Sequence, residues 1–374
     1  AFDYSAFPGH GYGEGSAHIF KKTGDSWAWE QQLFHPAARE LDGTVLPETR
    51  TSQGYGFPGR NFGSGVTISS DGAIVVVGAK GDGNGKYTSY TSATEPGNST
   101  GSAQVFVRTG TTWTHEAGLT NSSLAPNASY FGQFLSISGD GSRVIIGENN
   151  RNPNGAAHIF ARNSSTNTWS QEQDLTSLQT AGSSNSGYGR GVDISNDGTY
   201  AIVGAQADYN GTSVGIGGAY ILVRNTSTNA WTVQQKLIHP TQGPAGVTTW
   251  FGGHVGMSGD GTRVIIGAPF DNSATNVSNT GSAHIFVRSG TSWTYEKELN
   301  LEANRNSTTN PIRSSEYFGM GVTMSDDGNT VVVGAPNLWE PVYGGAQTTG
   351  SAHLYNKSAT NDWILNTRLA HPSP

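Results

Sequence analysis

The chain has 374 residues and a formal net charge of −7, so it can form one large or two ordinary domains and lacks the basic surface that nucleic-acid binding requires. It contains no cysteine, which excludes disulfides and thiolate metal sites. No apolar run approaches the roughly 18 residues that a membrane-spanning helix needs. Glycine is abundant at 52 residues, as expected for a chain with many tight turns.

The first segment of the chain resembles only the second half of the repeats that follow it. GSAHIF at residues 15–20 leads to Trp27, and LFHP at residues 33–36 closes the segment. A strand-like run, a polar turn and a second strand-like run predict two antiparallel strands. We expect residues 1–40 to form this half repeat.

Full repeats follow at about residues 55–120, 128–176, 186–240, 249–300 and 315–372. Each contains, near its start, an aromatic residue followed by glycine: Phe62, Phe131, Tyr188, Phe251 and Phe318. An aspartate of an Asp-Gly pair lies nine residues after each aromatic: Asp71, Asp140, Asp197, Asp260 and Asp327. The apolar–polar alternation between these markers predicts a strand, and Asp-Gly predicts a hairpin turn.

The remainder of each repeat predicts three further strands. A run such as IVVVGA at residues 74–79 is apolar on both faces, which indicates a buried second strand. A Gly-small-Ala run, such as GSAQVF at residues 101–106, predicts the third strand, and a run beginning near a tryptophan predicts the fourth. One repeat is therefore a four-stranded antiparallel meander.

Radial repetition of such sheets produces a β-propeller, in which each sheet is one blade. The constant offsets predict an all-β propeller with five complete blades and an outer half blade, in a single domain over residues 1–374. Six blades are expected in total, with seven as the alternative. The missing inner strands of the half blade have three explanations: upstream residues omitted from the chain, cleavage, or strand addition by a neighbouring molecule.

The FG…DG…GA…G-x-A pattern resembles the FG-GAP repeats of integrin α-subunit propellers and of many secreted proteins. The resemblance covers nearly the whole chain and implies an extracellular propeller used for adhesion or assembly. Calcium-binding members carry a D-x-D-x-D-G loop, whereas the turns here read SSDG, SGDG, SNDG, SGDG and SDDG. One or two carboxylates do not supply the roughly six to eight oxygens that calcium takes. We therefore interpret these aspartates as turn formers and expect no cofactor.

Three other aspartates, Asp82, Asp208 and Asp271, lie just beyond second strands and are the remaining metal candidates. His18, His158, His284 and His353 share one place in four repeats, where Gln104 and Tyr220 stand in two others. We interpret these histidines as structural residues that make hydrogen bonds. His35, His239 and His371 precede prolines at strand ends and are interpreted as edge caps.

No catalytic constellation stands out, so we expect no enzymatic activity. Ser213 in GTSVG matches a nucleophile-elbow pattern, but it lies in a polar loop between two strands instead of a strand–helix turn. Acid and base groups gathered near a propeller axis would be the enzymatic alternative, since sites of that kind are assembled from distant loops.

The sequence contains N-x-S/T sequons in predicted loops, which are the surface positions that N-glycosylation needs. They begin at Asn98, Asn121, Asn127, Asn163, Asn210, Asn225, Asn276, Asn306 and Asn356. We expect several to carry glycans, which would place the chain in a secretory pathway and outside the cell or on its surface.

Aromatic residues outside the repeat positions are candidate ligand or partner contacts: Trp250, Trp339 and Tyr343. They would either stack on a sugar or partner or pack over a blade. The sequence thus predicts an extracellular, non-enzymatic structural or adhesive glycoprotein that self-associates, in a filament or coat. The alternative is a lectin-like propeller that binds carbohydrate or protein.

Overall fold

The computed structural model describes residues 15–36, 61–82, 100–121, 129–178, 186–208, 215–241, 248–272, 277–301, 313–342, 345–348 and 350–370. The chain divides into two compact units, residues 1–174 and 175–374. The predicted single domain over residues 1–374 stays a prediction. Within the described ranges, no helix has the length and apolarity that a membrane crossing requires.

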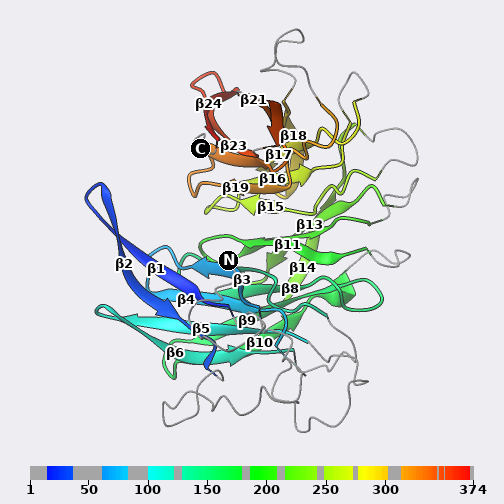
Figure 1. The fold of residues 1–374 in the computed structure, drawn as a ribbon. Helices are drawn as coiled ribbons and strands as arrows, with labels where there is room; N and C mark the ends of the chain where they lie inside the picture. Colours follow the sequence, from blue (N-terminus) through cyan, green and yellow to red (C-terminus); the bar gives the residue numbers. More distant parts are fainter. Residues whose placement is uncertain are drawn as a thin grey trace, which may run out of the picture. The chain divides into compact units, whose positions relative to one another are not determined.

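The first unit contains one two-stranded sheet and two four-stranded sheets (Figure 1). The half blade consists of β1 (Ala17–Thr23) and β2 (Ser26–Leu33). Blade 1 consists of β3 (Phe62–Ile68), β4 (Ile74–Ala79), β5 (Ser102–Thr109) and β6 (Thr112–Leu119). Blade 2 consists of β7 (Phe134–Ile137), β8 (Arg143–Glu148), β9 (Ala156–Asn163) and β10 (Thr168–Asp174).

The second unit contains three four-stranded sheets and a small hairpin (Figure 1). Blade 3 follows the 3-10 turn η3 (Thr176–Leu178) and consists of β11 (Tyr188–Ile194), β12 (Tyr200–Ala205), β13 (Gly218–Arg224) and β14 (Trp231–Leu237). Blade 4 consists of β15 (Val255–Met257), β16 (Arg263–Ala268), β17 (Ser282–Ser289) and β18 (Ser292–Leu299). Blade 5 consists of β19 (Gly321–Met324), β20 (Thr330–Ala335), β23 (Ser351–Lys357) and β24 (Trp363–Ala370). The hairpin of β21 (Trp339–Val342) and β22 (Gly345–Thr348) lies between β20 and β23 in the chain.

The predicted all-β fold, with five complete propeller blades and a half blade, is confirmed. Each complete blade is a sheet of four strands in chain order, and the hydrogen-bonded neighbours are antiparallel. The period-two alternation and the Asp-Gly turns located these strands because both are local features of the sequence.

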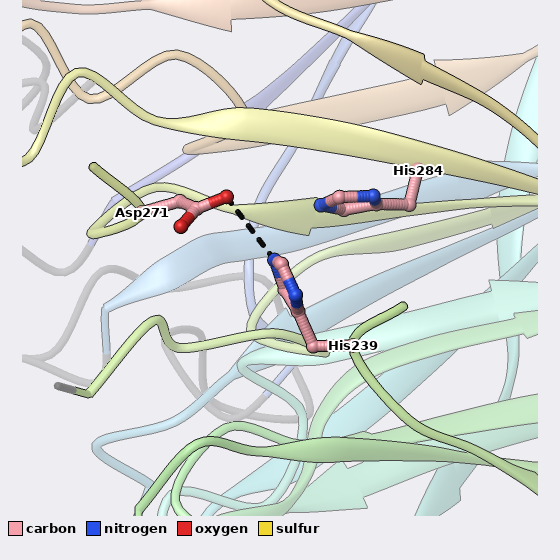
Figure 2. A group of neighbouring side chains, drawn as sticks. All are labelled: His239, Asp271 and His284. Atoms are coloured by element: carbon pink, nitrogen blue, oxygen red, sulfur yellow. Dashed lines mark hydrogen bonds and ion pairs between the residues drawn. The ribbon is translucent and has the colours of Figure 1, made fainter. Parts of the chain in front are cut away.

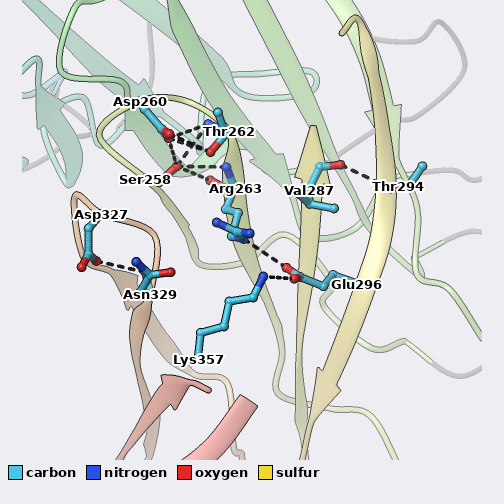
Figure 3. A network of polar contacts seen from close by, with 10 residues as sticks. All are labelled: Ser258, Asp260, Thr262, Arg263, Val287, Thr294, Glu296, Asp327, Asn329 and Lys357. Carbon is cyan, nitrogen blue, oxygen red and sulfur yellow. Dashed lines mark hydrogen bonds and ion pairs between the residues drawn. The ribbon is translucent and has the colours of Figure 1, made fainter. Parts of the chain in front are cut away.

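Aspartate side chains close the turns between first and second strands. In blade 4, the Ser258 hydroxyl donates to Oδ1 of Asp260 (2.7 Å), and the Thr262 amide donates to the same oxygen (2.9 Å; Figure 3). Gly261 between them has a φ of 64°, in the left-handed region that favours glycine. The serine–aspartate bond recurs at Asp71, Asp140, Asp197 and Asp327. The prediction that these aspartates form turns is confirmed.

The second strand of blade 1 supplies core residues to the neighbours on both sides. In β4, Val75 and Val77 join a buried cluster that includes Leu33 of the half blade. Val76 points the other way and joins a cluster that includes Phe131, which begins the blade 2 repeat. Because successive residues of a strand face opposite sides, an apolar run such as IVVVGA is buried on both faces only between two blades.

Glycines allow consecutive blades to approach closely. A Cβ atom added to Gly267 in β16 would lie 2.1 Å from the carbonyl oxygen of Gly319 in the next repeat. Gly281 forms a parallel β-bridge with Phe318, the aromatic residue that begins the same next repeat. The fixed positions of these residues in the repeat therefore reflect backbone contact between blades.

Polar side chains on the third and fourth strands also connect consecutive blades. Glu296 of β18 accepts a hydrogen bond from Arg263 of its own blade (3.3 Å) and bonds Lys357 of blade 5 (Figure 3). Glu116 of blade 1 likewise bonds both Arg162 and the indole of Trp169 in blade 2. Trp113, Trp169 and Trp293 thus combine a packing role with a hydrogen bond to the preceding blade.

Candidate metal centre

A second set of contacts between blades lies just beyond the fourth strands. His35 follows β2, and its Nε2 lies 3.1 Å from Oδ2 of Asp82, which follows β4 of blade 1. His239 follows β14, and its Nε2 lies 3.1 Å from Oδ2 of Asp271 in blade 4. We call the residue beyond a fourth strand and its acidic partner in the next blade a junction pair.

The junction pair of blades 3 and 4 lies beside a second histidine. His284 comes from β17, and one ligand atom each from His239, Asp271 and His284 lie within 4.8 Å of one another (Figure 2). The hydroxyl of Ser282 lies 2.8 Å from Asp271 Oδ2 and 2.8 Å from His284 Nε2. Both histidines are fully buried, and the aspartate is partly buried. Two imidazoles, a carboxylate and a hydroxyl therefore converge at one point.

The electrostatics of this cluster keep Asp271 charged and His284 neutral. Burial acts to raise the pKa of Asp271, but the hydrogen bond and charge of His239, together with the Ser282 hydrogen bond, outweigh burial and lower the pKa. Burial, assisted by the charge of His239, lowers the pKa of His284 to about 3. A neutral imidazole carries the lone pair that a metal ligand needs.

Other residues make the corresponding contacts at two further junctions. At the junction of the half blade and blade 1, the place of His284 is taken by Gln104, whose Nε2 lies 3.2 Å from His35 Nε2. At the junction of blades 1 and 2, the Asn121 amide donates to Glu148 (2.9 Å), and His158 Nε2 lies 2.8 Å from the same carboxylate oxygen. Within the described ranges, His239, Asp271 and His284 form the one group of three or more possible metal-ligating residues this close together.

The three aspartates predicted as metal candidates have different partners. Asp82 pairs with His35 and accepts a hydrogen bond from Ser102 (2.7 Å). Asp208 bonds the hydroxyl of Tyr220 and lies 3.1 Å from the ammonium of Lys236. That cation competes with a metal for Asp208, so Asp271 has the best ligand set of the three.

The histidines that share one repeat position are hydrogen-bonded, as interpreted from the sequence. His158 contacts Glu148, and in blade 5 the Ser351 hydroxyl lies 2.9 Å from Nε2 of His353. His18 of the half blade is exposed, with Nε2 3.1 Å from Ser16. Ser213 and His371 lie outside the described residues.

The described sequons differ in their exposure. Asn163 and Asn225 are exposed at the ends of hairpins, and their side-chain oxygens accept backbone hydrogen bonds from Ser165 and Ser227. These bonds use the amide oxygen, whereas a glycan is attached to the nitrogen. Asn356 is half-buried. Asn121 is buried, and its nitrogen donates to Glu148. The remaining sequons lie outside the described residues: Asn98, Asn127, Asn210, Asn276 and Asn306.

Trp250 packs within its own unit. Its ring centroid lies 4.2 Å from that of Phe270, and the guanidinium carbon of Arg190 lies 4.9 Å from the ring centroid. Trp250 is half-buried by these contacts. The backbone of Trp339 pairs with Thr348 in the β21–β22 hairpin. The Trp339 side chain and Tyr343 lie outside the described part of the structure.

Sequence reasoning identified Asp271, His239 and His284 separately and missed that they meet. The signal was present in two repeats: a histidine follows LF or LI at the end of one repeat, and an aspartate stands three residues beyond the final alanine of GA in the next. Combining the two requires the register between consecutive blades, which no pattern within a single repeat provides.

Comparison with known proteins supports the repeat assignment. A family model described as the FG-GAP repeat matches residues 231–286, so the chain contains an FG-GAP repeat there. The match extends from β14 to β17 and includes all three residues of the cluster. No curated protein matches the sequence.

Solved structures resemble the chain at low sequence identity. A functionally unknown protein from Desulfotomaculum acetoxidans is 12% identical, with a TM-score of 0.47, 84% of this chain and 71% of that chain covered. The periplasmic gluconolactonase PpgL of Pseudomonas aeruginosa is 14% identical, with a TM-score of 0.42 and coverages of 96% and 94%. Sqt1 of Saccharomyces cerevisiae is 11% identical, with a TM-score of 0.46 and coverages of 95% and 70%.

Proposed function

We propose that this chain is a non-enzymatic, extracellular structural or adhesive glycoprotein that self-associates through its half blade. The observation that supports self-association is the open edge of β1. In each complete blade the third strand pairs with two neighbours, whereas among the described residues β1 pairs with β2 alone. An open edge presents backbone donors and acceptors that a strand from another molecule can pair with.

The half blade also exposes apolar side chains that complete blades bury. Phe20 and Trp27 are 53% and 67% exposed, whereas their counterparts Phe106 and Trp113 in blade 1 are 5% and 4% exposed. Ile68, on the first strand of blade 1, is also exposed. Burial of these side chains would contribute roughly 1.5–3 kcal/mol each, which favours association.

A second copy of the chain is the partner that matches this surface. Leu369 of β24 is 56% exposed, whereas Leu299, at the same repeat position in blade 4, is 3% exposed. On the half blade and on blade 5, the chain thus exposes apolar side chains whose counterparts in complete blades are buried. The exposed sequons Asn163 and Asn225 support the extracellular and glycoprotein parts of the proposal.

Sedimentation velocity of the native glycosylated chain over a range of concentrations tests self-association. We expect the chain to form dimers or larger species, and Trp27→Glu to remain monomeric because it places a charge on the apolar surface. Thr232→Glu is the matched control, since Thr232 is exposed on β14 of a complete blade. A native chain that stays monomeric at all concentrations, or association that survives in Trp27→Glu, would overturn the proposal.

A further inference from the structure

We propose that His239, Asp271 and His284 bind a zinc-type divalent transition-metal ion at the junction of blades 3 and 4. The three residues supply two imidazole nitrogens and one carboxylate oxygen, which are ligands that zinc prefers in proteins. They come from two consecutive blades: His239 follows β14, and the other two belong to the blade 4 repeat. Their ligand atoms lie within 4.8 Å of one another.

To hold an ion, ligand atoms that lie up to 4.8 Å apart must move together to tetrahedral spacing. Metal–ligand bonds of about 2 Å place tetrahedral ligand atoms roughly 3.4 Å apart. The His239–Asp271 distance of 3.1 Å already meets that spacing. The Ser282 hydroxyl, 2.8 Å from both Asp271 and His284, marks the fourth position, which the hydroxyl or a water molecule would fill.

The surroundings of the two rings suit this role. Nδ1 of His239 lies 3.3 Å from the Thr241 hydroxyl, a contact that holds the ring with Nε2 directed at the centre. Nδ1 of His284 is buried and has no hydrogen-bond partner. The ligand atom that His284 directs at the centre is therefore Nε2, which lies 2.8 Å from the Ser282 hydroxyl.

The repeats provide comparisons within the same chain. The junction of the half blade and blade 1 keeps a histidine, an aspartate and a serine, but Gln104 replaces the second imidazole. Because an amide is a poor ligand for zinc compared with an imidazole, this junction is expected to bind no metal. Calcium does not suit the centre of blades 3 and 4 either, since a single carboxylate falls short of the oxygens it needs.

Titration calorimetry with zinc chloride, on the full chain after removal of metals by a chelator, tests the proposal. His239→Asn and His284→Gln each remove one ligand and introduce the residue that Asn121 or Gln104 contributes at another junction. We expect each variant to lose the site or to bind zinc at least about tenfold more weakly than the native chain. His35→Asn is the matched control and retains the native affinity.

Cobalt substitution and imidazole nitrogen resonances of the native chain provide readouts that do not depend on the variants folding. Tetrahedral coordination by the cluster predicts intense visible cobalt bands and zinc-induced shifts of two buried imidazole signals. Native-like zinc binding in the His239 and His284 variants overturns the proposal. So does a native chain that shows no zinc binding, no cobalt bands and no shifts.

Discussion

The imidazole of His35 lies 3.1 Å from the carboxylate of Asp82, and this contact joins the half blade to blade 1. Between blades 4 and 5, Leu301 and Leu338 stand at the same two repeat positions and share one buried cluster. The repeat thus places either a polar junction pair or two apolar residues at these structurally equivalent positions.

Because Leu301 and Leu338 occupy the equivalent positions between blades 4 and 5, we predict that leucines can replace His35 and Asp82 together. His35→Leu leaves the buried Asp82 carboxylate without its imidazole partner, and we expect it to lower the free energy of unfolding by about 3 kcal/mol. The double variant His35→Leu/Asp82→Leu should recover to within about 1 kcal/mol of the native chain, because leucines of similar volume replace both members. Urea unfolding measures both values. Purely additive losses would contradict the equivalence of the two pair types.

A pair of glycine substitutions tests the close approach of the blades. In Gly267→Ala the new Cβ would lie 2.1 Å from the Gly319 carbonyl oxygen, so we expect destabilisation of about 3 kcal/mol. Gly334 is the equivalent residue in blade 5, where the nearest atom to an added Cβ is 3.6 Å away. Gly334→Ala is therefore expected to change stability by less than about 1 kcal/mol. Thermal unfolding compares the two, and equal losses would show that blade contact is not the cause.

From the half-buried His254 we predict that the second unit loses stability in acid. Burial, assisted by the charge of Arg190, lowers the pKa of His254 to about 4, whereas an unfolded histidine has a pKa of about 6.5. Since the unfolded chain binds the proton more tightly, stability is full above pH 6.5 and falls as the pH drops towards 4. The loss is at most about 3 kcal/mol. Unfolding at pH 7 and pH 4.5 should show a smaller difference in His254→Gln than in the native chain. Identical pH dependence in the two would exclude His254 as a source.

Exposure predicts which sequons carry glycans. Intact-mass measurement of the native chain should show that Asn163→Gln and Asn225→Gln each remove one glycan, because both side chains are exposed. Asn121→Gln should leave the glycan mass unchanged, since the Asn121 nitrogen is buried and bonded to Glu148. A chain without glycans at Asn163 and Asn225 would remove the support that these residues give to an extracellular role.

Local patterns predicted the strands and turns, because each depends on residues close in sequence. Asp260 shows this well: its partners Ser258 and Thr262 lie two residues away on either side. The cluster of His239, Asp271 and His284 could not be predicted in the same way, because its members belong to two repeats. Their meeting depends on how β14 ends against blade 4, which is a property of packing.

The residues at the junctions differ from blade to blade, and this difference affects the order in which the similar repeats pack during folding. Leu301 at the end of blade 4 normally meets Leu338 of blade 5. If a blade with an aspartate at that position, such as Asp82 of blade 1, packed there instead, the carboxylate would face an aliphatic side chain, at a cost of several kcal/mol. Packing two blades in the wrong order therefore costs free energy, even though the blades share the same four-stranded sheet. The side chains at these positions therefore favour the native succession of the repeats within the chain.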